Sequence, residues 1–233
     1  MLPVGNNPKK QHKNTGVGKK LKKNITMKKL LLLTMLIVGL NLTAQENHFG
    51  IKLNIGQNTF AYKNVEGSQY STGKIGLGIG FMGEFMINDQ FAIAPEINYT
   101  MAGDNYEGEE SGIKFKSTIY LSYLKIPLLA RYYINENFSI EAGPYLGMLL
   151  TADRDYSITY DGNTDRDSKS IKDVFNDTDF GLNFGLGYKM ENGLFINARY
   201  SYGLSIINVL EDSNDKQEVR NAAINIGIGY FFK

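Results

Sequence analysis

The carboxylates Glu84 and Glu96 are the residues of this 233-residue sequence that most directly suggest catalysis. Glycoside hydrolysis, for example, needs two carboxyl groups that flank a bound substrate. Cysteine chemistry is excluded because the sequence has no Cys, and His48 is the one histidine that follows the first 44 residues. Whether Glu84 and Glu96 can flank a substrate depends on the elements that carry them.

Apolar and polar residues alternate in eight segments after residue 45. A period of two is typical of β-strands with one apolar face, and no segment has a convincing helical period of 3.6 residues. The sequence therefore predicts an all-β fold of eight strands. The segments are 49–55, 75–85, 91–99, 124–132, 138–148, 180–188, 194–202 and 222–232.

The connections between these segments are of two kinds. Three are short and similar to one another, at 87–91, 134–138 and 190–194. The other four are long and polar, and they cover 62–73, 103–117, 152–178 and 205–218. Short turns at one end and long loops at the other are typical of outer-membrane barrels. We therefore expect an eight-stranded antiparallel up-and-down transmembrane β-barrel with both termini on the periplasmic side.

A soluble eight-stranded barrel such as a lipocalin has the same period of two, but its polar face points to water. Here the polar face is rich in Gly and Asn and has few Lys or Glu per strand, which is unusual for a water-exposed surface. It is suitable as the lining of a narrow lumen, where Gly leaves room for larger side chains. This composition favours the membrane barrel.

Charged residues on the polar face are expected to point into the lumen, where they must be paired, hydrated or near a rim. The register of the 134–138 turn predicts one specific ion pair, Arg131 with Glu141, because cross-strand partners share a face. We expect the group to be structural. Its main members are Glu84, Glu96, Lys125, Arg131, Glu141 and Arg199; Lys52, Asp179 and Lys189 also face inward.

A filled lumen has no substrate cleft, so the sequence predicts no enzyme, no catalytic residue and no cofactor. Five Asp residues between 153 and 167 could bind calcium, but they lack the spacing of a calcium loop, which favours a solvated acidic loop and no metal site. Glycines such as those at 76–80 have the period of a strand and no helix after them, so they do not indicate nucleotide binding.

Pro95, Pro127 and Pro144 lie inside predicted strands. Proline cannot donate to a β-ladder, and a closed barrel has no edge strand where its missing N–H would be harmless. The three prolines therefore predict bulges or local interruptions of the ladder.

The first 44 residues differ from the rest in charge. They contain nine Lys and no Asp, Glu or Arg, so the remaining 16 bases and 24 acids give residues 45–233 a net charge of −8. Residues 27–44 have a basic start, an apolar run of about 13 residues and a small residue before Gln45, as secretory signal peptides do. A single membrane-spanning anchor would need ~20 apolar residues.

The sequence thus predicts three parts: a disordered upstream extension (1–26), a signal peptide (27–44) and the barrel (45–233). The Lys-rich start could alternatively bind nucleic acid or anionic lipid, but an export signal that follows it would remove it from the mature protein. We therefore expect no nucleic-acid partner.

Three stretches resemble the PorT family of outer-membrane β-barrel proteins of Bacteroidetes-type bacteria. They are YLKIPLLARYYI (123–134), DFGLNFGLGYKMENGLFINARYSYGLSII (179–207) and INIGIGYFF (224–232). Barrels of this kind typically end in an aromatic residue, whereas this chain ends in Lys233 after two Phe. The resemblance implies a cell outer-membrane location, contact with outer-membrane lipid, and insertion by the barrel-assembly machinery.

The expected function is that of a non-enzymatic scaffold whose loops contact protein partners. Two alternatives remain open from the sequence. One is a small-solute porin. The other is an accessory component of a secretion apparatus, because the founding member of the PorT family is associated with gliding and secretion.

Overall fold

The computed structural model describes residues 46–63, 70–208 and 218–232 of the chain. By its contacts the chain divides into two compact units, Met1–Leu42 and Thr43–Lys233, and all described residues belong to the second. The predicted extension and signal peptide, residues 1–44, lie outside the described residues.

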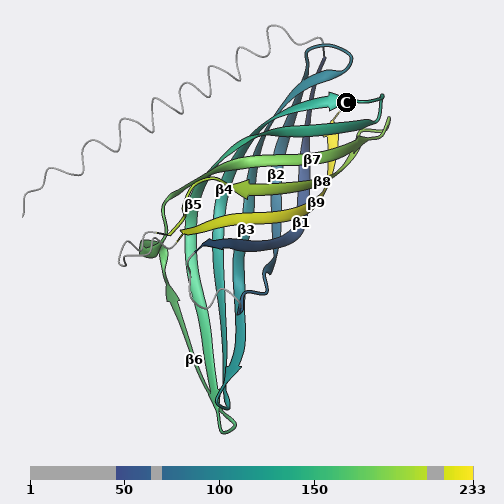
Figure 1. Ribbon diagram of the computed structural model, residues 1–233. Coiled ribbons are helices and arrows are strands. Elements are labelled where there is room, and N and C mark those ends of the chain that lie inside the picture. The colour runs from purple at the N-terminus through teal and green to yellow at the C-terminus, as the bar shows by residue number, and fades with distance from the viewer. Residues whose placement is uncertain (1–45, 64–69, 209–217, 233) are drawn as a thin grey trace, which may run out of the picture. The chain divides into compact units, whose positions relative to one another are not determined.

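The described residues form one antiparallel sheet of nine strands and a short 3-10 helix (Figure 1). The strand order is β4-β3-β2-β1-β9-β8-β7-β5-β6, and β4 also pairs with β5, so eight strands close into a barrel. The predicted eight-stranded fold is therefore confirmed, with β6 as a ninth strand outside the ring. The elements are β1 (Glu46–Lys63), β2 (Lys74–Met86), β3 (Phe91–Glu110), β4 (Ile113–Tyr133), β5 (Phe138–Tyr160), β6 (Asn163–Ser170), η2 (Lys172–Val174), β7 (Thr178–Lys189), β8 (Leu194–Gly203) and β9 (Glu218–Phe232).

The three short turns, which define the turn end of the barrel, share one geometry. In each turn the first N–H donates to the carbonyl oxygen four residues later, at 2.8 or 2.9 Å. An Asn caps each turn: the Oδ1 atoms of Asn88 and Asn135 accept two backbone N–H groups each, and that of Asn192 accepts one. The sequence repeat is thus a repeat of structure, and Asn is used because its side chain satisfies free turn amides.

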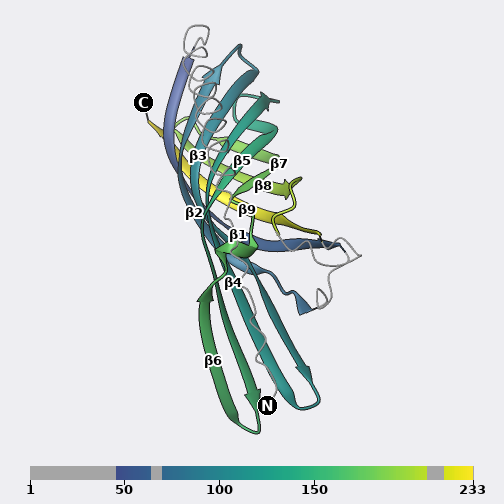
Figure 2. The same ribbon diagram turned by 90° about the vertical axis from the view of Figure 1, so that its left-hand side faces the viewer.

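We call the opposite end the loop end. Two of the four loops predicted there are wrong, because those segments form β-strands. Residues 103–117 and much of 152–178 continue the strands, so β3 and β4 form one long hairpin and β5 and β6 form another. The hairpins extend beyond the other strands (Figures 1 and 2) and pair through β4 and β5 into a four-stranded projecting sheet. Polar residues alternate with apolar ones here, because this part of the sheet needs no lipid-facing surface.

A bulge in β5 reverses the two faces of this strand at the base of the projecting sheet. The β4–β5 register shifts by one residue between Ser122 and Tyr123, opposite Leu149 and Thr151. Leu149 and Ala152 are both buried in the lumen. Odd-numbered residues of β5 therefore face inward between the turn end and the bulge, and even-numbered residues face inward beyond the bulge, toward the hairpin tip. One extra residue in a strand has this effect because side chains alternate with a period of two.

The three strand prolines interrupt the ladders without shifting the register. The β2–β3 ladder lacks two pairs beside Pro95, and the β4–β5 ladder lacks two pairs between Pro127 and Ala130, opposite Pro144. Of the two predicted outcomes, local interruption is therefore confirmed and a bulge at the prolines is not.

The outer surface of the barrel is apolar all round. Phe81, Ile75 and Ile224, for example, expose 68%, 68% and 64% of their surface. At the turn end the outward residues form an aromatic girdle, which consists of Phe49, Phe91, Tyr132, Phe138, Tyr188, Tyr230 and Phe232. A soluble barrel has the opposite polarity, so the alternative of a lipocalin-like barrel is wrong.

Candidate functional site: the charged barrel interior

Arg131 is the centre of an ionic network inside the barrel. It is fully buried, and its Nη1 and Nη2 atoms donate to Glu84 Oε2 at 2.5 Å and to Glu141 Oε2 at 2.9 Å. Arg131 and Glu141 lie opposite each other in the β4–β5 register, so the predicted ion pair is confirmed. The Arg131 guanidinium also packs on the Phe195 ring at 4.4 Å from its centroid.

Arg199 shares Glu141 with Arg131 and joins one more carboxylate, Glu96, to this centre. Its Nε and Nη2 donate to Glu141 Oε1 at 2.9 and 2.6 Å, and its Nη1 and Nη2 donate to the two oxygens of Glu96 at 2.9 and 3.0 Å. Such two-pronged arginine–carboxylate pairs are strong because both groups are charged and their geometries match.

Two lysines complete a chain of alternating charges. Lys52 Nζ is 2.8 Å from Glu96 Oε2, and Lys189 Nζ is 2.6 Å from Glu84 Oε1. The chain then contains four cations and three anions, which come from seven of the eight barrel strands. Its order is Lys189, Glu84, Arg131, Glu141, Arg199, Glu96 and Lys52.

Neutral side chains satisfy further lone pairs of the three glutamates. Tyr133 donates to Glu84 at 2.5 Å, Asn98 to Glu96 at 2.9 Å and Asn197 to Glu141 at 3.2 Å. Buried charges are tolerated when they are paired and also hydrogen-bonded in this way. The carboxylates of Glu84 and Glu96 are therefore paired with cations. Both residues are buried, with 0% and 2% exposure, and they do not line a substrate cleft.

Lys125 is the one member of the predicted cluster that the structure places elsewhere. It forms a second group with buried Asp179, 3.8 Å from its carboxylate, and lies 4.6 Å from the centroid of the Tyr145 ring. Tyr145, Ser205 and Asn221 donate to Asp179 at 3.0, 2.9 and 2.9 Å. The predicted single cluster is thus two groups, because Lys125 and Asp179 lie nearer the loop end along their strands.

Apolar layers lie on both sides of these charges. Met82, Phe195 and Phe231 are buried together at the turn end. A larger layer lies at the loop end and consists of Phe60, Ala102, Leu121, Tyr123, Leu149, Ala152, Phe175 and Ile207. The lumen is consequently filled by side chains along its length.

Glycines on the inner face make this filling possible. A Cβ atom on Gly181 would lie 2.5 Å from the Tyr145 ring, and one on Gly229 would lie 2.7 Å from Cε of Met82. The predicted use of Gly to make space for large lumen side chains is confirmed at these positions.

A small polar cavity of about 60 Å³ remains between the two charged groups. It is lined by several Asn side chains, and the buried Asn98 Oδ1 and Asn183 Nδ2 atoms have no protein hydrogen-bond partner there. A polar cavity of this size is large enough to hold water. A space of this size cannot serve as a solute pathway.

Asp104 anchors the loop-end rim, a role that sequence reasoning missed because Asp104 fell in a predicted loop. Its buried carboxylate accepts hydrogen bonds from Tyr62 Oη at 2.6 Å, Ser71 Oγ at 2.7 Å and the Gly73 N–H at 2.9 Å. Tyr62 also contacts the Tyr106 hydroxyl. We call Tyr62, Ser71, Gly73 and Asp104 the rim clasp; it joins β1 and the segment just before β2 to β3.

Burial raises the pKa of Tyr106 to about 12, and burial together with the hydrogen bond to Asp104 raises that of Tyr62 as well. Both phenols therefore stay protonated at neutral pH, and Tyr62 can act as a donor to the carboxylate. The clasp is recognised by the several donors that surround one buried carboxylate. The sequence does not show which donors approach Asp104, so it could not predict the clasp.

The five loop Asp residues do not converge. Asp153 and Asp155 face outward on β5, Asp165 and Asp167 face inward on β6, and Asp161 lies in the turn between the strands. Among the described residues no group of three or more His, Cys, Asp or Glu could hold a metal ion. No helix in the described ranges is long and apolar enough to cross a membrane.

Comparison with known proteins places this architecture in a family. The family described as outer membrane protein beta-barrel domain matches residues 43–208, and no curated protein matches. The chain therefore belongs to this family, and it is an outer-membrane β-barrel protein whose outer surface contacts lipid.

Solved structures of small outer-membrane barrels are similar over most of the chain. Ail of Yersinia pestis is 18% identical with a TM-score of 0.42 and covers 81% of this chain and 100% of its own. Neisserial surface protein A is 13% identical with a TM-score of 0.43 and the same coverage. OprG of Pseudomonas aeruginosa is 16% identical with a TM-score of 0.42, over 81% of this chain and 97% of its own.

Proposed function

We propose that this protein is a non-enzymatic scaffold of the outer membrane that displays the projecting sheet to partners outside the cell. One observation carries the proposal: the lumen is filled by the alternating chain of charges and by apolar layers on both sides of it. In a barrel that neither conducts solutes nor holds a substrate, the loop end is the surface that remains available for binding partners. The described start of β1 and the described end of β9 lie at the turn end, which supports a periplasmic location for the turn end and the termini.

The resemblance to the PorT family supports a more specific role, as an accessory component of a secretion apparatus. The YLKIPLLARYYI stretch supports this resemblance and contains the central Arg131. Insertion by the barrel-assembly machinery follows from the same resemblance. Isolation of the intact membrane complex tests the role: a stable assembly with other envelope proteins is expected, and recovery of free monomer alone would oppose it.

Conductance in planar bilayers tests the scaffold against the porin. We expect purified protein to give no discrete openings, because the residual lumen cavity is only about 60 Å³. A useful comparison is the triple variant F60A/L121A/F175A, which thins the loop-end layer. Nanosiemens openings from the unmodified protein would contradict the scaffold, whereas openings from the triple variant alone would support the filled lumen.

A further inference from the structure

The projecting sheet has two faces of opposite character. Its outward face is polar and pairs its charges: Lys116 is 2.5 Å from Glu107, and Lys114 is 3.8 Å from Glu109. Its inward face, which continues the lumen side of the barrel wall beyond the bulge, is apolar and aromatic. The inner aromatic face consists of Tyr106, Ile113, Phe115, Tyr156, Ile158 and Tyr160.

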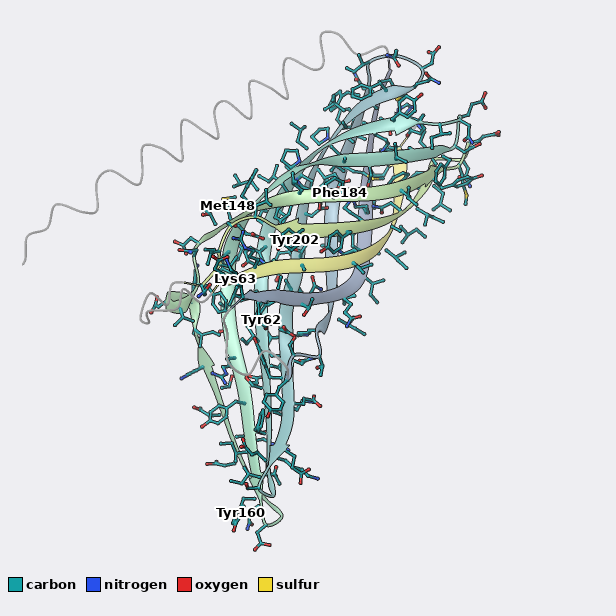
Figure 3. The ribbon with its side chains drawn as sticks, in the orientation of Figure 1. Tyr62, Lys63, Met148, Tyr160, Phe184 and Tyr202 are labelled. Carbon is teal, nitrogen blue, oxygen red and sulfur yellow. The ribbon has the colours of Figure 1, made fainter. Side chains whose placement is uncertain are left out.

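Much of this face is exposed in the described structure. Tyr160, Ile158, Ile113 and Tyr156 expose 63%, 43%, 40% and 36% of their surface. Tyr70 packs on Phe115, with 5.1 Å between the ring centroids, and covers part of the face next to β3. The exposed half lies near the hairpin tips, where Figure 3 shows Tyr160 far from Phe184 on the barrel wall. Contiguous exposed apolar side chains of this kind mark interaction sites.

The charges around the exposed half are acidic. Asp165 and Asp167 lie beside Ile158 and Tyr156 in the β5–β6 register, Glu110 lies beside Ile113, and Asp161 forms the tip. The basic residues of this face, Arg154 and Lys169, lie opposite each other in the β5–β6 register at its base, and Arg154 donates to Ser117 at 2.8 Å. The inner aromatic face thus has an acidic margin.

We propose that the inner aromatic face docks a polypeptide segment that combines apolar and basic side chains. The inference rests on the proposed scaffold function and names the class of partner. The aliphatic side chains of Ile113 and Ile158 favour a polypeptide over a glycan, which is bound by flat aromatic platforms. A second copy of this chain is disfavoured, because a symmetric contact would bring two acidic margins together.

The face is a better docking surface than the free edge of β6. That edge strand alternates Asp165, Arg166, Asp167 and Lys169 and is fully exposed. Charged residues on an edge strand oppose the addition of another strand. The partner is therefore expected to contact side chains and not the β6 backbone.

The test is binding of synthetic peptides to the full barrel in nanodiscs of zwitterionic lipid, with empty nanodiscs as the blank. A peptide that contains Lys and Phe is compared with two matched peptides, one with Glu for Lys and one with Ser for Phe. We expect only the Lys/Phe peptide to bind, with an affinity that falls as salt increases.

The variants then locate the site. I158S/Y160S is expected to weaken binding on the order of tenfold, a loss of about 1.4 kcal/mol. D165N/D167N, which removes charge but little volume, is expected to weaken binding and to reduce its salt dependence. E107Q/K116Q on the outward face is the matched control and should bind as the unmodified protein does.

Equal binding of the Glu/Phe peptide, or full binding by both inner-face variants, would overturn the proposal. So would dimers or glycan binding that disappear with I158S/Y160S. Should I158S/Y160S lose its β-structure, D165N/D167N decides alone. Absence of peptide binding in a barrel that does not conduct would refute this inference and leave the scaffold function standing, whereas conductance would refute the scaffold itself.

Discussion

Arg131 shows what a single residue does in this barrel. It neutralises two carboxylates from different strands, Glu84 and Glu141, while its guanidinium packs against the Phe195 ring. Removing one partner from a buried ion pair is costly because the other charge stays buried without compensation. The network therefore depends on each residue that joins two partners of opposite charge, Arg131 among them.

For Arg131→Met we expect the free energy of unfolding to fall by about 3–5 kcal/mol, because Glu84 and Glu141 lose their shared cation. Urea unfolding in detergent micelles, followed by the circular dichroism signal of the β-sheet, measures the change. The control is K116M, whose exposed pair with Glu107 should contribute about 0–1 kcal/mol. Equal effects of the two substitutions would contradict the importance of the buried network.

A second residue-scale prediction concerns the rim clasp. In Asp104→Ala the backbone N–H groups of Phe60, Gly73 and Asn105 lose their acceptor. We expect these amides to exchange hydrogen faster by at least tenfold, since a hydrogen bond from an amide N–H to a charged acceptor contributes about 1.5–3 kcal/mol. The turn-end amides of Phe91 and Phe138 serve as an internal control and should not change.

The pair of Arg131 and Glu141 could be predicted because the turn between their strands fixes the register. Arg199 could be placed inside the lumen by its alternation, but not opposite Glu96 and Glu141, which come from β3 and β5. Contacts across a lumen depend on how strands tilt and how far side chains reach, and one sequence does not contain that information. Lys125 was grouped wrongly for the same reason.

At the scale of elements, the bulge in β5 decides what the projecting sheet presents. If the same residues of β5 continued in regular alternation without a bulge, Asp153 and Asp155 would face inward and Tyr156 and Ile158 outward, since a shift of one residue exchanges the faces of a strand. The strands themselves follow from the alternation of residue types. The bulge could not be foreseen, because Leu149, Leu150 and Ala152 fit either face.

Deletion of Thr151 tests the role of the bulge. Lys116 and Ser157 are partners on the outward face, and the chain has no cysteine of its own. We expect K116C/S157C to form a disulfide under mild oxidation both with and without Thr151, because the deletion removes the one extra residue and leaves Lys116 opposite Ser157. The turn-end barrel should still fold, as judged by its resistance to unfolding in SDS at room temperature. Loss of the cross-link in the deletion variant would show that β5 does not accommodate one extra residue in a bulge at this point.

At the scale of the whole molecule, the barrel is polar inside and apolar outside, and this polarity inverts where the projecting sheet begins. Membrane barrels and water-exposed sheets have opposite requirements for their two faces. The inversion separates the lipid-embedded wall from the part that projects beyond it. The family and the fold agree with the sequence-based expectation, whereas the extent of the projecting sheet does not follow from loop length alone.

The central claim is that the projecting sheet is displayed at the cell surface while the turn end faces the periplasm. Single cysteines at Tyr160 on the sheet and at Glu136 in the β4–β5 turn test it most directly, since both positions are exposed and neither belongs to the network. Intact cells that express each variant are treated with a membrane-impermeant maleimide, and lysed cells provide the full signal. The account predicts labelling of Y160C in intact cells and of E136C only after lysis; labelling of E136C but not Y160C in intact cells would contradict it.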